Sequence, residues 1–179
     1  MSETVSIHRL LDAGPTPDIE RGIDAIFFES SNTKSFESEP VRAAFRERWL
    51  GRYLRHDPQF GYLALRPSGE VAGYLVGAIE DPAQAARFAD IEFFNALREQ
   101  TKKFPAHLHV NVAPDFRNRG IGGRLIDHFV ADAKALGSPG VHVVTGAGSP
   151  NISFYNRNGF AEIVRAGTSG QLLFLGRAL

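Results

Sequence analysis

Three glycines and three arginines gather between an apolar run and the start of a predicted helix. They are Gly120, Gly122, Gly123, Arg117, Arg119 and Arg124. Glycine has no Cβ to keep an anion from the backbone, and the first amides of a helix have no acceptor within the helix. The arginines add positive charge at the same place. The segment therefore predicts a phosphate-binding turn, with an ordinary strand-to-helix turn as the alternative.

Two common phosphate-loop patterns fail on these residues. A dinucleotide fingerprint G-x-G-x-x-G starting at Gly120 would need glycine at position 125, where the chain has Leu125. The nucleoside-triphosphate pattern G-x-x-x-x-G-K-[ST] has no match either. The pattern R-x-x-G-x-G does fit, with Arg117, Gly120 and Gly122 at its fixed places. It resembles the acyl-CoA pyrophosphate loop of the GNAT acetyltransferases.

A second segment resembles the signature that follows this loop by one helix and one strand in the same family. Its matching residues are Asn151, Phe154, Tyr155, Gly159 and Phe160. The gap between Asn151 and Phe154 is shorter than in many members. Taken alone, the segment also reads as a short helix closed by glycine, with both phenylalanines in the core. The two signatures in order favour the family resemblance.

The resemblance implies a set of residues that bind the cosubstrate acetyl-CoA. The pantetheine arm would pair with the backbone of the strand before the turn, the pyrophosphate would lie on the turn, and Asn151 would bond near the thioester. The implied cofactor-binding residues are Val110, Asn111, Val112, Arg117, Asn118, Arg119, Gly120, Ile121, Gly122, Gly123, Asn151 and Tyr155.

Acyl transfer to an amine needs a group that takes a proton and a group that gives one. In the family's pattern the residue matching Tyr155 gives a proton to the departing thiolate. A phenol of pKa ~10 can protonate a thiolate whose thiol has a pKa of ~8.5 when the two are in contact. A tyrosine that only packs is the alternative.

Histidines on the strand before the turn are candidates for the base. His107, His109 and Asn111 alternate with apolar residues, so they share one face of the strand, which we expect to point toward the first helices and the substrate cleft. The family often has a glutamate on this strand, and this chain has none. We predict His109 as the base, directly or through a water, because histidine titrates near working pH. His107 and a purely structural role for both stay open, and no metal site is expected without a third ligand.

The fold class expected is α/β (α+β), with a central mixed, mostly antiparallel sheet of six to seven strands flanked by helices. The resemblance adds a splayed strand pair that holds acyl-CoA. Residues 1–179 are expected to form one domain. A helix over 40–54 should bury a stripe at Val41, Phe45, Trp49 and Tyr53. The apolar side chains of Asp81–Lys103 should pack on the core or cover a pocket mouth, and a lid is preferred.

Composition excludes several classes of protein. The chain has 179 residues, with Lys+Arg and Asp+Glu at 20 each, so no global basic field would hold nucleic acid. Cysteine is absent, which excludes disulfides and thiolate metal sites. The N-terminus does not resemble a signal peptide, and no apolar run reaches the ~20 residues that span a bilayer. A cytoplasmic protein is expected, with no membrane partner and a possible homodimer.

Three functions compete. The first is an acetyl-CoA-dependent N-acetyltransferase that transfers acetyl directly to a primary amine of a small molecule or peptide. The second is a catalytically weak or inactive acyl-CoA-binding sensor. It is suggested by a resemblance of residues 104–111 and 175–179 to the acetyltransferase-like domain attached to O-GlcNAc hydrolases, some of which are inactive. The third is another nucleotide or phosphate binder. The acceptor cleft is expected to be lined by segments such as Phe28–Glu39, and the residue types of this segment do not identify the acceptor.

Overall fold

The computed structural model describes residues 4–179, and its backbone divides into two compact units. Unit 1 consists of Met1–Gly77 and His109–Phe129, and unit 2 of Ala78–Leu108 and Val130–Leu179. The chain therefore passes between the units three times, within two strands and within one helix. The expectation of one domain over 1–179 stays a prediction.

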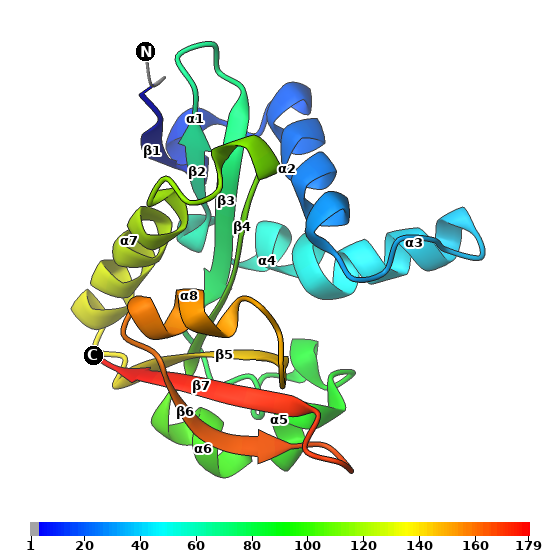
Figure 1. Cartoon of the computed structure of the whole chain (residues 1–179), viewed down its shortest axis with the longest axis vertical. Helices are drawn as coiled ribbons and strands as arrows, with labels where there is room; N and C mark the ends of the chain where they lie inside the picture. The colour runs from blue at the N-terminus through cyan, green and yellow to red at the C-terminus, as the bar shows by residue number, and fades with distance from the viewer. Residues whose placement is uncertain (1–3) are drawn as a thin grey trace. The chain divides into compact units, whose positions relative to one another are not determined.

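The described residues contain one seven-stranded sheet with the order β1-β2-β3-β4-β5-β7-β6 (Figure 1). The strands are β1 (Ser6–Arg9), β2 (Tyr62–Leu65), β3 (Val71–Ala78), β4 (Ala106–Val112), β5 (Gly140–Gly146), β6 (Ala161–Ala166) and β7 (Leu172–Ala178). β4 and β5 pair in parallel, at Ala106↔Val141 and His107↔His142. The pairs β1–β2, β2–β3, β5–β7 and β6–β7 are antiparallel. The expected mixed, mostly antiparallel sheet flanked by helices is confirmed.

In unit 1, α2 forms where its sequence predicts a helix. α1 (Leu10–Ala13) and α2 (Pro17–Ser30) follow β1, and the Thr16 hydroxyl accepts a hydrogen bond from the Ile19 amide at 3.3 Å. This cap satisfies one of the free amides at the helix start. The buried side chains of α2 are Ile19, Ile23, Ile26 and Phe27. They recur at helical spacing and so face the core.

The helical run after α2 differs from the expected buried stripe. It consists of α3 (Glu39–Arg46), a π-helical turn η1 (Glu47–Gly51) and α4 (Arg52–His56), and a 3-10 turn η2 (Pro58–Phe60) follows. Val41 is 45% exposed, whereas Tyr53 is 1% exposed and Leu50 is fully buried. A π turn adds a residue to the helical repeat, so side chains four apart no longer share one face. The prediction of a buried stripe is therefore wrong for Val41 and confirmed for Tyr53.

Unit 2 contains the segment for which a lid was preferred. Its elements are η3 (Ala86–Phe88), α5 (Glu92–Ala96) and α6 (Arg98–Lys103). Phe88, Ile91, Phe94 and Leu97 are buried, and the rings of Phe88 and Phe94 contact His107 of β4. The prediction of a lid is therefore wrong for these four side chains, because they pack in the core of their own unit. In the view of Figure 1, α8 (Ile152–Arg157) and the α5–α6 segment lie on opposite sides of β7.

A long helix, α7 (Ile121–Ala135), follows the glycine turn through a 3-10 turn, η4 (Pro114–Phe116). Its side chains at Ile121, Leu125, Phe129 and Ala133 are all buried, as their four-residue spacing predicts. The helix ends at Ala135, and Gly137, two residues later, has a φ of 80°, which suits glycine best.

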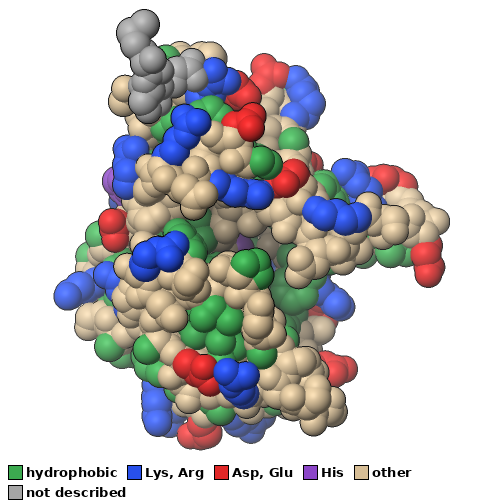
Figure 2. Space-filling view, in the orientation of Figure 1, with side chains coloured by type: hydrophobic (Ala, Val, Ile, Leu, Met, Phe, Trp, Pro, Cys, Tyr) green, Lys and Arg blue, Asp and Glu red, His purple; other side chains and the backbone are tan. Residues whose placement is uncertain are grey.

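Two surface properties bear on possible partners. Acidic and basic side chains are interspersed over the face drawn in Figure 2, in keeping with the equal numbers of the two charges. None of the described helices has the length and hydropathy needed to cross a bilayer.

Candidate functional site

The glycine turn of unit 1 leaves backbone amides available at the start of α7. Gly120 has a φ of 74°, and the first helical bond runs from the Arg124 amide to the Gly120 carbonyl at 3.1 Å. The amides of Ile121, Gly122 and Gly123 come before that bond, so they have no acceptor in the helix. A Cβ built on Gly120 would meet no atom within 4 Å. The turn therefore has open space, free amides and a helix N-terminus, which together fit a phosphate group.

The three arginines of the turn have different contacts. The Arg117 guanidinium donates to the Val112 carbonyl at 3.0 Å and to Glu29 Oε2 at 2.6 Å. Arg124 donates to the Val5 carbonyl at 3.0 Å. The Arg119 guanidinium carbon lies 5.3 Å from the centre of the Phe116 ring. Positive charge is present as the sequence predicts, but two of the three arginines also hold the backbone.

The end of β4 lies close to β3. The Asn111 side-chain amide donates to the Tyr74 hydroxyl at 2.9 Å, and a Cβ on Gly73 would lie 3.1 Å from the Asn111 carbonyl oxygen. Burial raises the pKa of Tyr74, and the nearby Asp24 carboxylate adds to the increase while the Asn111 hydrogen bond opposes it. Tyr74 is therefore protonated at working pH.

Sequence reasoning missed this polar pair. A tyrosine within a buried strand is normally assigned to the core, so no pattern indicated Tyr74. Asp24 was missed because it is one of several acidic residues on an amphipathic helix, and nothing in the sequence distinguishes it from the others. It pairs with Arg46, whose guanidinium lies 2.8 Å from Asp24 Oδ1. Only the fold brings α2, β3 and β4 together around Asn111.

His109 lies among aromatic rings of the first helices, as its strand face predicts. Its ring centre is 5.2 Å from that of Tyr53 and 6.0 Å from that of Trp49. Burial, and then the nearby Arg52 cation, lower the pKa of His109 to about 4. The expectation that His109 titrates near working pH is therefore wrong. The neutral imidazole can still accept a proton, but it is a weak base.

His107 belongs to the core of unit 2. It is 3% exposed, and its ring lies 4.9 Å from Phe88 and 5.4 Å from His142, with Nδ1 at 3.2 Å from the Pro105 carbonyl. A carbonyl oxygen only accepts, so Nδ1 carries the proton. These contacts favour the structural alternative for His107. In residues 4–179 no three His, Asp or Glu side chains gather as a metal site would require.

Asn151 and Tyr155 lie in unit 2. The Thr145 hydroxyl donates to Asn151 Oδ1 at 3.0 Å, which orients the amide at the start of α8. Tyr155 is 7% exposed, with ring centres of Phe154 and Phe160 at 5.2 and 5.6 Å. Burial raises the pKa of Tyr155 to about 12. The phenol therefore keeps its proton at working pH, as a donor must.

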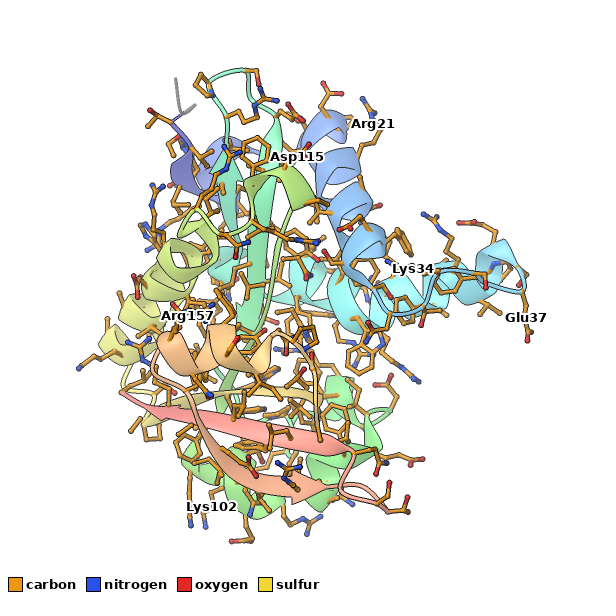
Figure 3. All side chains as sticks on the ribbon, in the orientation of Figure 1. Arg21, Lys34, Glu37, Lys102, Asp115 and Arg157 are labelled. Atoms are coloured by element: carbon orange, nitrogen blue, oxygen red, sulfur yellow. The ribbon has the colours of Figure 1, made fainter. Side chains whose placement is uncertain are left out.

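A pocket of about 350 Å³ opens in unit 1 where α2 ends and α3 begins. It is lined by Phe28, Thr33, Lys34, Ser35, Phe36, Ser38, Glu39 and Arg42. In Figure 3, Lys34 lies in the loop that connects α2 to α3, and Glu37 lies at the far end of the same loop. The Phe28 and Phe36 rings meet edge to face at 5.8 Å, and the Arg42 guanidinium carbon lies 3.7 Å from the centre of the Phe28 ring. The pocket lies in the segment that was expected to line the acceptor cleft.

A sequence profile described as the acetyltransferase (GNAT) family matches residues 23–160. The chain belongs to this family. The match includes the glycine turn of unit 1 and the Asn151–Phe160 segment of unit 2. GNAT proteins transfer acetyl groups and use acetyl-CoA as the donor.

Solved structures share the GNAT fold over nearly the full chain. SsHAT is 20% identical, with a TM-score of 0.74 and 98% of each chain covered. PH1933 from Pyrococcus horikoshii is 11% identical, with a TM-score of 0.73, and covers 98% of this chain and 99% of its own. A chain of the NatC complex bound to Gag peptide and CoA is 14% identical, with a TM-score of 0.63 and 98% of each chain covered. At these identities the likeness concerns the fold alone.

The GNAT signatures of this chain fall in different units. The turn and the end of β4 belong to unit 1, and Asn151 and Tyr155 to unit 2. The catalytic roles of His109 and Tyr155, the cofactor roles, and the likeness to domains attached to O-GlcNAc hydrolases stay predictions.

Proposed function

We propose that this chain is an acetyl-CoA-dependent N-acetyltransferase that transfers acetyl directly to a primary amine of a small molecule or peptide. The observation that carries the proposal is the open turn at Gly120, followed by three helix-start amides, in a member of the GNAT family. Such a turn suits a diphosphate, because amides and arginines both favour negative charge.

The cofactor residues divide by the part of the cofactor that each would hold. The backbone of Val110 and Val112 pairs with the pantetheine arm. The turn from Arg117 to Gly123 holds the pyrophosphate. Asn151 bonds near the thioester, with its amide already oriented by Thr145. The open space over Gly120, directly before the helix-start amides, supports the pyrophosphate assignment most directly.

The acceptor must lose a proton, because a protonated amine has no lone pair for attack. Acetyl-CoA supplies the acetyl group and a thiol as the leaving group. His109 takes the proton of the amine, directly or through a water. Its pKa of about 4 makes the imidazole neutral and able to accept a proton, but weakly basic on either route.

Tyr155 donates a hydrogen bond to the sulfur of the leaving thiolate. Its pKa of about 12 keeps the hydroxyl protonated. Full transfer to a thiolate of pKa ~8.5 would be uphill by roughly 5 kcal/mol, since each pKa unit is worth about 1.4 kcal/mol. The hydroxyl therefore stabilises the developing thiolate as a hydrogen-bond donor, and any proton transfer follows that bond.

A second function, an acyl-CoA-binding sensor, is favoured by one observation. The candidate base has a strongly lowered pKa, and β4 carries no glutamate that could replace it. In that case the turn binds acyl-CoA and no acceptor is acetylated.

Release of free thiol from acetyl-CoA, followed over a panel of primary amines and peptides, separates these functions. The transferase should release thiol in the presence of at least one amine, with an acetylated product of the matching mass. Tight acetyl-CoA binding with no product from any amine would support the sensor. A cytoplasmic location and a homodimer belong to the same proposal, and sedimentation of the purified chain tests the second.

A further inference from the structure

Arg117 is bound to an acidic partner from a distant part of the chain. Its Nη2 lies 2.6 Å from Glu29 Oε2 and 3.4 Å from the Ser30 hydroxyl, and its Nε donates to the Val112 carbonyl at 3.0 Å. Glu29 and Ser30 end α2, and Val112 ends β4. The arginine of the phosphate-binding pattern therefore joins the turn to the end of α2.

Glu29 also contacts the segment that lines the pocket. Its backbone carbonyl accepts a hydrogen bond from the Lys34 ammonium group. Phe28, the residue before Glu29, and Lys34 both line the pocket. Glu29 thus lies between the turn on one side and the pocket on the other, and all of these residues belong to unit 1.

The Arg117–Glu29 pair is exposed enough to exchange partners. The Arg117 and Glu29 side chains are 46% and 43% exposed. An exposed ion pair of this kind is worth at most about 1 kcal/mol. A diphosphate carries more negative charge than a carboxylate and accepts the planar guanidinium fork equally well. A phosphate group on the turn would therefore compete successfully for Arg117.

From these contacts we infer that Glu29 is a positioning residue that competes with the CoA diphosphate for Arg117 and transmits occupation of the turn to the pocket. The inference rests on the proposed function, since it needs CoA on the turn. When CoA binds, Arg117 moves from Glu29 to the diphosphate. The end of α2 then loses its link to the turn, and the 31–38 segment changes the contact that its Lys34 makes with Glu29. CoA occupation thereby alters the pocket before an acceptor enters it.

A double-mutant cycle tests the competition. Calorimetry gives the Kd for CoA in the parent, Glu29→Gln, Arg117→Gln and the double variant. Glu29→Gln should lower the Kd for CoA about two- to fivefold, the change expected when a competing surface ion pair is removed. In the Arg117→Gln background the same replacement should change the Kd by less than about 1.5-fold. Asp18→Asn, which removes another exposed carboxylate of α2 that pairs with Arg21, is the control and should leave the Kd unchanged.

Hydrogen exchange of the 31–38 amides tests transmission to the pocket. Saturating CoA should change their exchange rates in the parent and leave them unchanged in Glu29→Gln, where the link is already weakened. If the parent binds CoA and Glu29→Gln leaves the Kd unchanged or raises it, the inference is overturned and the proposed function still stands. Equal exchange changes in parent and variant overturn it as well. No binding of CoA to the parent would overturn the proposed function itself.

Discussion

At the scale of single residues, burial sets the protonation states of the candidate catalytic groups. The pKa of His109 falls to about 4 and that of Tyr155 rises to about 12, and desolvation is the main cause in both cases. Burial disfavours the charged form, which is the cation for histidine and the anion for tyrosine. Both side chains are therefore neutral at neutral pH.

Replacing Tyr155 with phenylalanine tests the donor role. The ring packing with Phe154 and Phe160 remains, so the fold and the Kd for CoA should survive. Turnover with a working acceptor should fall by roughly 10²- to 10³-fold, the range found when one hydrogen-bond donor to a developing negative charge is removed. Steady-state rates and calorimetry give the two quantities. Tyr62→Phe, which removes a hydroxyl from a tyrosine buried in β2, is the matched control, and an unchanged rate in Tyr155→Phe would leave proton delivery to water.

The lowered pKa of His109 predicts a pH dependence of stability. An unfolded chain binds this proton near pH ~6.5, and the folded chain binds it only near pH 4, so the unfolded state holds more protons in between. Lowering the pH through this window therefore destabilises the fold. The full shift would be worth roughly 3 kcal/mol, and solvent contact of the half-buried ring reduces that figure.

Denaturant unfolding at pH 7 and pH 4.5 measures the effect. His109→Gln should lose less free energy of unfolding than the parent between these two values. His56→Gln, at an exposed position at the end of α4, should keep the dependence of the parent. Identical losses in the parent and in His109→Gln would mean that the ring titrates as an exposed histidine does.

At the scale of elements, the glycine turn was predictable because its residues have few alternative uses. Positive φ at Gly120 and the unpaired amides of α7 both follow from the local pattern. The π turn at Glu47–Gly51 was not predictable, since the sequence continues a four-residue repeat through it. Packing of Leu50 and Tyr53 into the core outweighs the regular helix there, and Val41 is left exposed as a consequence.

Substitutions of Gly120 separate charge from backbone strain. Gly120→Glu places a carboxylate where the diphosphate would lie and should abolish acetyl-CoA binding, while Gly120→Ala adds only the cost of a side chain at positive φ, about 1 kcal/mol. Gly69→Glu is a matched control, because Gly69 has a φ of 85° and open space but lies in the β2–β3 turn. Calorimetric titration and thermal melts give affinity and folding. If Gly120→Glu bound acetyl-CoA as the parent does, the turn would not be the anion site.

At the scale of the whole molecule, the sequence predicted a mixed, mostly antiparallel sheet of six to seven strands flanked by helices, and the fold confirms it. A glycine-rich turn between β6 and β7 favours a hairpin, but no local pattern places β7 between β5 and β6. Strand order depends on pairing between distant segments, which periodicity does not encode. The same reason hid the Asp24–Tyr74–Asn111 cluster, whose members lie on three elements far apart in the chain.

Ligand-dependent stability distinguishes an acyl-CoA protein from another phosphate binder. A ligand that binds only the folded state adds about 2.7 kcal/mol at a free concentration of 100 times its Kd. For a chain of this size that should raise the Tm by roughly 5 to 11 °C. Thermal melts with acetyl-CoA and with CoA should show such a rise, and both rises should disappear in Gly120→Glu. ATP and NAD at the same concentration should leave the Tm unchanged, because the turn lacks the lysine and the third glycine that their loops use. A rise with ATP or NAD that equals the rise with CoA would place this chain among general nucleotide binders.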